Sequence, residues 1–441
     1  MRYKRQAIVV SVAIAIIIFA QCSKAFEKNG VKGDVEAKQA IEKEKSLVAQ
    51  GKEIFRFDTF GDEDFWSGLL HLDKAIAGTN NGGFGPGVSP MDALAVGLKV
   101  DAEVLPSEIV EGIKSGSISL DDPATTLALL KLNAVVGVKG NFNQSGALTS
   151  LGITCASCHS TVDNSFSFGI GKRLDGWPNR DLNVGGIISL TDNAQPIASL
   201  LHVDEATLRS ILSQWGPGKF DAELIVDGKA FYPDGRLSAN LIPAAFGLKD
   251  ITLTTYTGWG DISYWNAFVA NLEMHGKGNF SDPRLNDPVK YPIAVENSFY
   301  NVTNNPDLIT SKLPALKAYQ HSLDAPKPPA GSFDQQAASR GKSIFLSKAR
   351  CASCHRLPLL ADNILHTGAE IGIDDFEAMR SPTNKYRTTP LGGLFTRTKG
   401  GFFHDGRFAN LTDVINHYDA ALSLNLTASE KRDLQEYLES L

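Results

Sequence analysis

Four of the five cysteines in the chain lie in two copies of one pentapeptide. Residues 155–159 and residues 351–355 both read CASCH. Two thiols three positions apart can reach the two vinyl groups of one porphyrin, and the histidine that follows can ligate its iron. C-x-x-C-H is therefore the attachment sequence of c-type haem. The pattern predicts two covalently bound haem c groups, with His159 and His355 as proximal iron ligands.

Other interpretations of the two motifs fit less well. A structural zinc ion needs four ligands, so each C-x-x-C would need two more, and no other cysteine is available. A redox-active C-x-x-C has no need of a histidine directly after it. Two structural disulfides would not favour the same five residues twice. The four cysteines predicted to carry haem are Cys155, Cys158, Cys351 and Cys354.

Residues 1–21 have the pattern of an export signal. Three basic residues precede an uncharged apolar stretch over 7–20, which has the length of a signal-peptide core and is short for a membrane span. The fifth cysteine, Cys22, follows at once, so we expect a lipoprotein-type signal, with cleavage before Cys22 and a lipid on its thiol. Cleavage after Ala25 is the alternative and leaves no anchor. Both predict the periplasm, and the first predicts attachment to the outer membrane.

Length and an internal repeat predict two domains. The chain has 441 residues and a net charge of −6, which argues against nucleic acid as a partner. The segment GKSIF precedes the second motif, and GKEIF (51–55) repeats it, but Cys155 follows only 100 residues after Phe55. We therefore expect an N-terminal haem domain over 22–323 with an insertion at about 56–154. A proline-rich linker over 324–332 and a C-terminal cytochrome c domain over 333–441 follow.

Apolar spacing predicts helices that could cover each haem. Leu411, Val414, Ile415 and Tyr418 follow the i, i+3, i+4, i+7 pattern of one helical face. The same spacing recurs in the first half at Trp265, Phe268, Val269 and Leu272. Signals for strands are few and short. The sequence predicts a mostly α protein with two cytochrome c-like domains.

Together, the two CASCH motifs and the segment YRTTPLGGLFTRTKGGFFHDGRFANLTDVINHYD (386–419) resemble the bacterial di-haem cytochrome c peroxidase superfamily. Within it, they are most similar to the enzymes that mature methylamine dehydrogenase. The resemblance covers about 331–441 well and 140–280 loosely. It implies an oxidoreductase of peroxidase type that reduces hydrogen peroxide at the N-terminal haem, or that uses peroxide to oxidise a substrate. It also implies a partner: a small cytochrome or cupredoxin as electron donor, or a protein or organic substrate.

The resemblance places a sixth iron ligand twelve residues after Gly406, at Tyr418. Peroxidases of the superfamily carry methionine there, and the maturation enzymes carry tyrosine. A phenolate is a hard anionic donor that favours ferric iron. A core tyrosine with a hydrogen-bonded hydroxyl is one alternative, and Met379 as a thioether ligand is another. His417 is less suited, because it is rotated by about 100° from Tyr418 around the helix.

The first haem is predicted to keep an open sixth position. Residues 160–186 contain no histidine, and the helical face opposite the haem presents Leu272 with Glu273 beside it. Glu273 and His275 are candidate acid–base groups there, or ordinary residues at a helix end, and His275 could also swing onto the iron. The resemblance places Trp259 between the two haems as an electron relay, with simple packing as the alternative.

Two further expectations concern a metal ion and the function. Proteins of the superfamily hold a calcium ion between the haems, and Asn183, Thr388 and Pro390 stand at compatible positions. An electron-transfer cytochrome without substrate chemistry is the first alternative function, and would be favoured if both irons were six-coordinate. A haem-dependent dioxygenase is the second.

Overall fold

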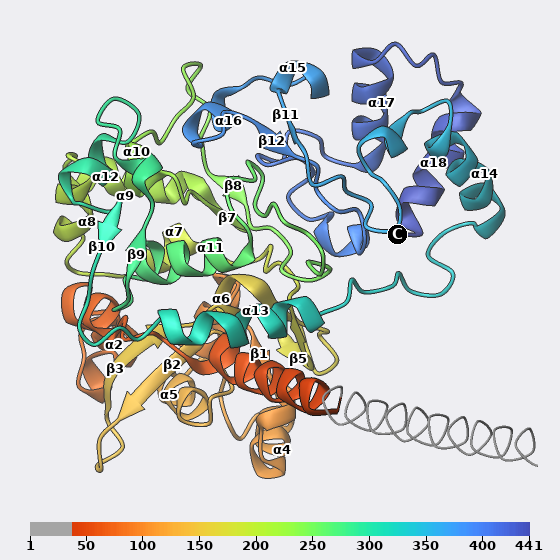
Figure 1. Cartoon of the computed structure of the whole chain (residues 1–441). Helices are drawn as coiled ribbons and strands as arrows, with labels where there is room; N and C mark the ends of the chain where they lie inside the picture. The colour runs from red at the N-terminus through yellow and green to blue at the C-terminus, as the bar shows by residue number, and fades with distance from the viewer. Residues whose placement is uncertain (1–37) are drawn as a thin grey trace, which may run out of the picture.

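The computed structural model describes residues 38–441 (Figure 1), so the predicted signal and Cys22 lie outside the described part. The described chain is mostly helical, as predicted, and its strands form six short pairs. Among the described residues, no helix is both long and apolar enough to cross a membrane. The division into two cytochrome c-like domains stays a prediction.

The insertion is a set of short helices and one hairpin, and it follows a helix over 38–57. Its α- and π-helices are the π-helix Asp64–Leu69, α2 (Leu72–Ala77), α3 (Pro90–Ala95), α4 (Ser107–Ser115) and α5 (Pro123–Lys131). Its strands are β1 (Val100–Asp101), β2 (Val138–Phe142) and β3 (Leu148–Ile153). Leu129 and Leu151 of the insertion share the largest apolar core with Leu208 and Leu212 of α9 (Glu205–Trp215). The insertion is thus part of the first half's core.

The hairpin β2–β3 delivers the chain to the first motif, which forms α6 (Ala156–His159). Gly137 precedes the hairpin at a φ of +82°, and a Cβ there would lie 2.2 Å from the backbone nitrogen of Ser157. Ser157 Oγ donates to the carbonyl of the same glycine at 2.5 Å. Only glycine permits this close approach. The insertion therefore fixes the position of the first CASCH turn.

The rest of the first half surrounds that turn with short elements. The strands are β4 (Ser160–Val162), β5 (Ile170–Gly171), β6 (Arg173–Asp175), β7 (Lys219–Phe220), β8 (Asn240–Leu241), β9 (Phe280–Ser281) and β10 (Asn301–Val302). The helices besides α9 are α7 (Val184–Ile188), α8 (Gln195–Leu200), α10 (Leu224–Asp227), α11 (Ile262–Phe268), the π-helix Val269–Glu273, α12 (Pro292–Glu296) and α13 (Leu313–Ser322).

The C-terminal helices α14 (Gln335–Leu346), α17 (Leu411–Ala421) and α18 (Ala428–Glu439) lie together at one end of the molecule (Figure 1). Between α14 and α17 run α15 (Gly368–Ile371), α16 (Phe376–Arg380), β11 (Leu365–His366) and β12 (Tyr386–Arg387). Helices α14 and α18 cross at Gly341, where a Cβ would lie 1.8 Å from the carbonyl oxygen of Asp433. The second CASCH turn follows α14 directly.

Candidate haem centres

The histidine of the second motif is held in the orientation that an iron ligand needs. His355 Nδ1 lies 2.9 Å from the carbonyl oxygen of Leu360. A carbonyl only accepts hydrogen bonds, so Nδ1 carries the proton and Nε2 keeps its lone pair. Metal-ligating histidines are usually fixed in this way through the other ring nitrogen. The ring of His355 is therefore ready to bind iron through Nε2.

The first motif repeats the arrangement. His159 Nδ1 donates to the carbonyl oxygen of Pro243 at 3.1 Å, and burial lowers the pKa of the ring to about 4, so it is neutral. Cys155 and Cys158, like the cysteines of the second motif, are free thiols. Each motif thus presents two thiols and one oriented imidazole within a single turn. This donor set fits a c-type haem at both motifs.

A cavity of about 710 Å³ opens on the second motif. Pockets for cofactors and ligands commonly measure about 300–1,000 Å³. Side chains of the motif and of α17 line it, and so do residues from the first half. Its lining includes Cys351, Cys354, His355, Tyr418, Pro243 and Phe246. The cavity has the place and the size that a haem attached to the second motif requires.

Three buried arginines in the cavity wall lack a carboxylate partner within the described residues. Arg180, Arg387 and Arg397 donate only to backbone carbonyls, and the Nε atoms of Arg180 and Arg397 have no partner there. Burial lowers the pKa of Arg387 and Arg397 to about 10. Buried cations need compensation, and the two propionates of a haem would supply it. The wall therefore fits an anionic porphyrin.

Tyr418 faces this cavity, as its register predicted. It lines the cavity together with Leu411, Val414 and Ile415, which confirms the predicted helical face. Within residues 38–441, its hydroxyl makes no hydrogen bond, so the interpretation as a hydrogen-bonded core tyrosine finds no support. Burial raises the pKa of the phenol, and nearby Cys354 adds to the rise. As an iron ligand, Tyr418 stays a prediction.

The two alternative ligands lie elsewhere. Met379 sits on α16 with 54% of its surface exposed and is absent from the cavity wall. His417 does not line the cavity, and its Nε2 donates to the carbonyl of Ile371 at 2.8 Å. A thioether ligand from Met379 is therefore not compatible with this structure, because the side chain points to solvent.

Glu273 lies close to the first motif. Met274 N donates to the carbonyl of Val269 at 2.8 Å, an i to i−5 bond that turns the end of this helix into a π-helix. Such single π-turns are frequent at functional sites. Glu273 is 9% exposed, and its Oε1 has no partner within the described chain. Burial raises its pKa and also raises the pKa of the Cys158 thiol to about 12, with Glu273 as a further cause.

His275 and Trp259 both lie in aromatic surroundings, His275 half-buried and Trp259 buried. The ring of His275 stacks on Phe65 of the insertion at 3.6 Å, and burial lowers its pKa to about 4. Trp259 packs on Phe268 at 5.5 Å, and its Nε1 has no partner in the described chain. A Cβ on the preceding Gly258 would lie 2.9 Å from Arg387 Cβ. Trp259 thus packs against α11, beside a glycine that contacts Arg387, and its role as an electron relay stays a prediction.

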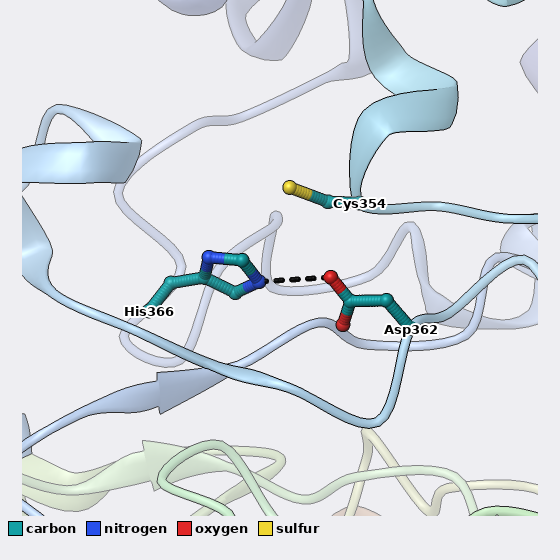
Figure 2. Close-up of side chains that lie close together, drawn as sticks. All are labelled: Cys354, Asp362 and His366. Carbon is teal, nitrogen blue, oxygen red and sulfur yellow. Dashed lines mark hydrogen bonds and ion pairs between the residues drawn. The ribbon is translucent and has the colours of Figure 1, made fainter.

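A cluster of Cys354, Asp362 and His366 has metal-ligand chemistry but does not form a separate metal site. Their ligand atoms lie within 4.8 Å of one another, and His366 Nε2 is 3.0 Å from Asp362 Oδ2 (Figure 2). With haem attached, Cys354 becomes a thioether and offers no thiolate. The remaining pair is too small a donor set for zinc. We assign it to the edge of the second haem site.

Two of the three predicted calcium ligands use their oxygens within the protein. Asn183 Oδ1 accepts a hydrogen bond from Gly186 N at 2.9 Å and caps α7. The carbonyl of Pro390 accepts from Arg397 Nη1 at 3.0 Å, which places a cation there already. Thr388 lines the second cavity. The structure therefore gives the predicted calcium ion no support, and it stays a prediction.

Sequence reasoning missed the three arginines. Arg387 and Arg397 lie inside the segment 386–419 that carried the family resemblance, so their position in the sequence could have indicated that they lie near the second haem site. Arg180 lies about 200 residues earlier, and nothing in its local sequence marks it. Only the folded chain brings it to the second cavity.

Two oriented histidines, each beside a pair of free thiols, are consistent with two sites for c-type haem. No protein-family model matches it. The chain is related to the MauG-like di-haem cytochrome c peroxidases. Over 220 residues it is 26% identical to the methylamine utilization protein MauG of Methylorubrum extorquens, a match that covers 42% of this chain and 61% of that protein. It thus spans about three fifths of that relative.

Two solved structures are also similar. One is hydrazine synthase of Kuenenia stuttgartiensis, with 24% identity, coverage of 34% of this chain and 59% of that one, and a TM-score of 0.24. The other is a MauG-like protein associated with microbial copper homeostasis, with 18% identity, coverage of 52% and 79%, and a TM-score of 0.27. TM-scores of this size do not support a comparison of folds.

Proposed function

We propose that the protein is an exported di-haem oxidoreductase of peroxidase type. In this proposal hydrogen peroxide is reduced at the first motif, and electrons enter through the second. The observation that carries it is the difference between the two sites. In the second cavity, the hydroxyl of Tyr418 has no hydrogen-bond partner within the described chain, and it is suited to occupy the sixth coordination position of a haem iron. A buried carboxyl group, Glu273, lies near Cys158 of the first motif.

Glu273 supplies the acid–base chemistry in this proposal. When bound, the haem would supply the electrons and the site where peroxide binds. Cleavage of the O–O bond needs a proton moved from one oxygen to the other. Burial raises the pKa of Glu273, which favours the protonated form of its carboxyl group. A positioned acid–base group typically contributes about 10²–10⁴-fold to a rate.

The surroundings of the protein belong to the same proposal. We propose a periplasmic location, with a lipid on Cys22 as the membrane attachment. The electron donor would be a small cytochrome or cupredoxin. A protein or organic substrate oxidised with peroxide is the other use of the same site.

A titration with stoichiometric peroxide tests the proposal. The purified protein should contain two haems that resist acid–acetone extraction, and peroxide should change its visible spectrum. Glu273→Gln should slow that change about 10²–10⁴-fold, whereas Glu296→Gln, an exposed glutamate paired with His202, should not. If peroxide leaves the spectrum unchanged and no donor is oxidised, the enzyme proposal fails and the electron-transfer alternative takes its place.

A further inference from the structure

Tyr232 and His404 form a buried hydrogen-bonded pair beside the second cavity. The two atoms Tyr232 Oη and His404 Nε2 lie 3.0 Å apart, and the residues are 4% and 2% exposed. Burial raises the pKa of the phenol and lowers the pKa of His404 to about 4. Both groups are therefore neutral, and in the His404 tautomer that carries its proton on Nδ1, the phenol donates its hydrogen bond to Nε2.

The pair lies between the cavity and the surface. His404 lines the second cavity, where Tyr386 stacks on its ring at 5.3 Å. On the other side, the ring of Tyr232 stacks on Phe376 at 3.9 Å. The guanidinium of Arg236 lies 4.2 Å from the centre of the Tyr232 ring, and the Arg236 side chain is 49% exposed. The side chain of Arg236 thus lies between Tyr232 and solvent, and the side chain of His404 lies between Tyr232 and the cavity.

We propose that Tyr232 is a redox-active tyrosine that carries oxidising equivalents between the second cavity and the surface at Arg236, with His404 as its proton acceptor. This inference rests on the proposed function, which supplies hydrogen peroxide as the oxidant. A buried phenol is hard to oxidise unless its proton has an acceptor, because a charged radical would be left without solvent. His404 provides that acceptor within hydrogen-bond distance.

The step balances as a one-electron oxidation. Tyr232 gives up one electron to the oxidising equivalent derived from peroxide, its O–H bond breaks, and the proton forms an N–H bond at His404 Nε2. A neutral tyrosyl radical and an imidazolium remain. A one-electron donor at the surface then reduces the radical, and His404 returns the proton. Two such electrons and two protons from solvent convert one hydrogen peroxide into two waters.

Electron paramagnetic resonance after rapid freezing tests the inference. Peroxide should produce a radical signal that narrows when the protein contains ring-deuterated tyrosine. Tyr232→Phe keeps the ring and its stacking, and should remove most of that signal. Tyr291→Phe is the matched control: Tyr291 is also buried, and its hydroxyl has no partner in the described chain, so the signal should persist. A tyrosine signal undiminished in Tyr232→Phe would overturn the inference.

A second arm separates this inference from the proposed function. A ruthenium photosensitiser with persulfate oxidises the resting protein from outside, without peroxide. It should give the same tyrosyl signal in the wild type, coupled to an exchangeable proton, and Tyr232→Phe should lack it. If peroxide changes no spectrum, the proposed function fails while this arm still decides the role of Tyr232. Equal signals in both proteins would refute it.

Discussion

Tyr418 differs from the other tyrosines near the second motif in what its hydroxyl touches. Tyr232 and Tyr386 use theirs in hydrogen bonds to His404 and to the carbonyl of Asp374. The hydroxyl of Tyr418 faces the cavity without a partner in the described chain. A hydroxyl that faces the cavity in this way is free to contact a cofactor bound there.

Tyr418→Phe should therefore change the second haem and leave the first unaltered. Loss of an anionic ligand that favours the ferric state should raise the reduction potential of that haem, or open its sixth position to cyanide. Spectroelectrochemistry and electron paramagnetic resonance of the ferric protein measure both effects. Met379→Leu, at an exposed position, is the control and should behave as the wild type. An unchanged potential would mean that Tyr418 only packs.

The buried arginines lead to a prediction with the opposite sign. Arg397→Met removes a positive charge from the cavity wall, so the ferric state should gain stability and the reduction potential of the second haem should fall, by roughly tens of millivolts. Arg340→Met, at an exposed arginine paired with Asp433, is the control and should not change the reduction potential of the second haem. A potential that rises or stays constant in Arg397→Met would contradict our assignment of this wall to the propionates.

Residue types and spacing were enough to locate the two thiol–histidine turns and to predict that Tyr418 faces the cavity, whereas covalent attachment of haem stays a prediction. Both depend on local sequence: the thiols and histidine of one turn, and one face of one helix. The carbonyl partners of His159 and His355 could not be predicted in this way, since Pro243 lies 84 residues from its histidine. The role of Arg180 could not be predicted for the same reason, because its burial without a carboxylate partner is visible only in the folded chain.

Among the secondary-structure elements, the end of α11 departs most from the sequence expectation. The pattern at Trp265, Phe268 and Leu272 predicted one continuous α-helix, and those residues do share a core. The helix nevertheless ends as the π-helix Val269–Glu273. A π-turn holds one more residue than an α-turn, so it changes the direction of Glu273. Periodicity could not show this, because the apolar residues fit both helices.

Helices α14 and α18 give a prediction about stability. Their backbones meet at Gly341, where a methyl group would lie 1.8 Å from the Asp433 carbonyl. Gly341→Ala should force the helices apart and cost about 1–3 kcal/mol of unfolding free energy. Chemical denaturation followed by near-ultraviolet circular dichroism measures it. Ser343→Ala, at an exposed position of α14, should change the free energy little. Equal losses in both variants would count against the crossing.

At the scale of the molecule, a buried ionic cluster joins the two halves of the chain. Arg380 of α16 contacts Asp221 and Asp227 of the first half at 2.8 Å each, and Glu377 at 3.3 Å. All four side chains are at most 1% exposed. Removing one partner from such a cluster leaves uncompensated charge and typically costs about 3–5 kcal/mol.

Arg380→Met should lower the unfolding free energy by about that amount near neutral pH. The loss should shrink as the pH falls, because the stranded carboxylates take up protons. In the wild type, burial raises the pKa of Glu377 to about 7, above its unfolded value, so the native state binds this proton more tightly. That contribution is complete below the unfolded pKa and is lost as pH rises through about 7.

Urea denaturation at several pH values measures both effects. Lys45→Met, at an exposed pair with Glu42, should differ from the wild type by less than about 0.5 kcal/mol at every pH. A loss in Arg380→Met that does not depend on pH would contradict the role of the carboxylates.

The wall of the second cavity is built from both halves of the chain. Arg180 and Phe246 come from the first half, Ala325 from the segment between the halves, and His355 from the second half. A porphyrin bound through thioethers to Cys351 and Cys354 would therefore act as a crosslink. It would be tied covalently to one half and by charge to the other. A protease cut within 324–332 should leave the two pieces associated while the cofactor is in place.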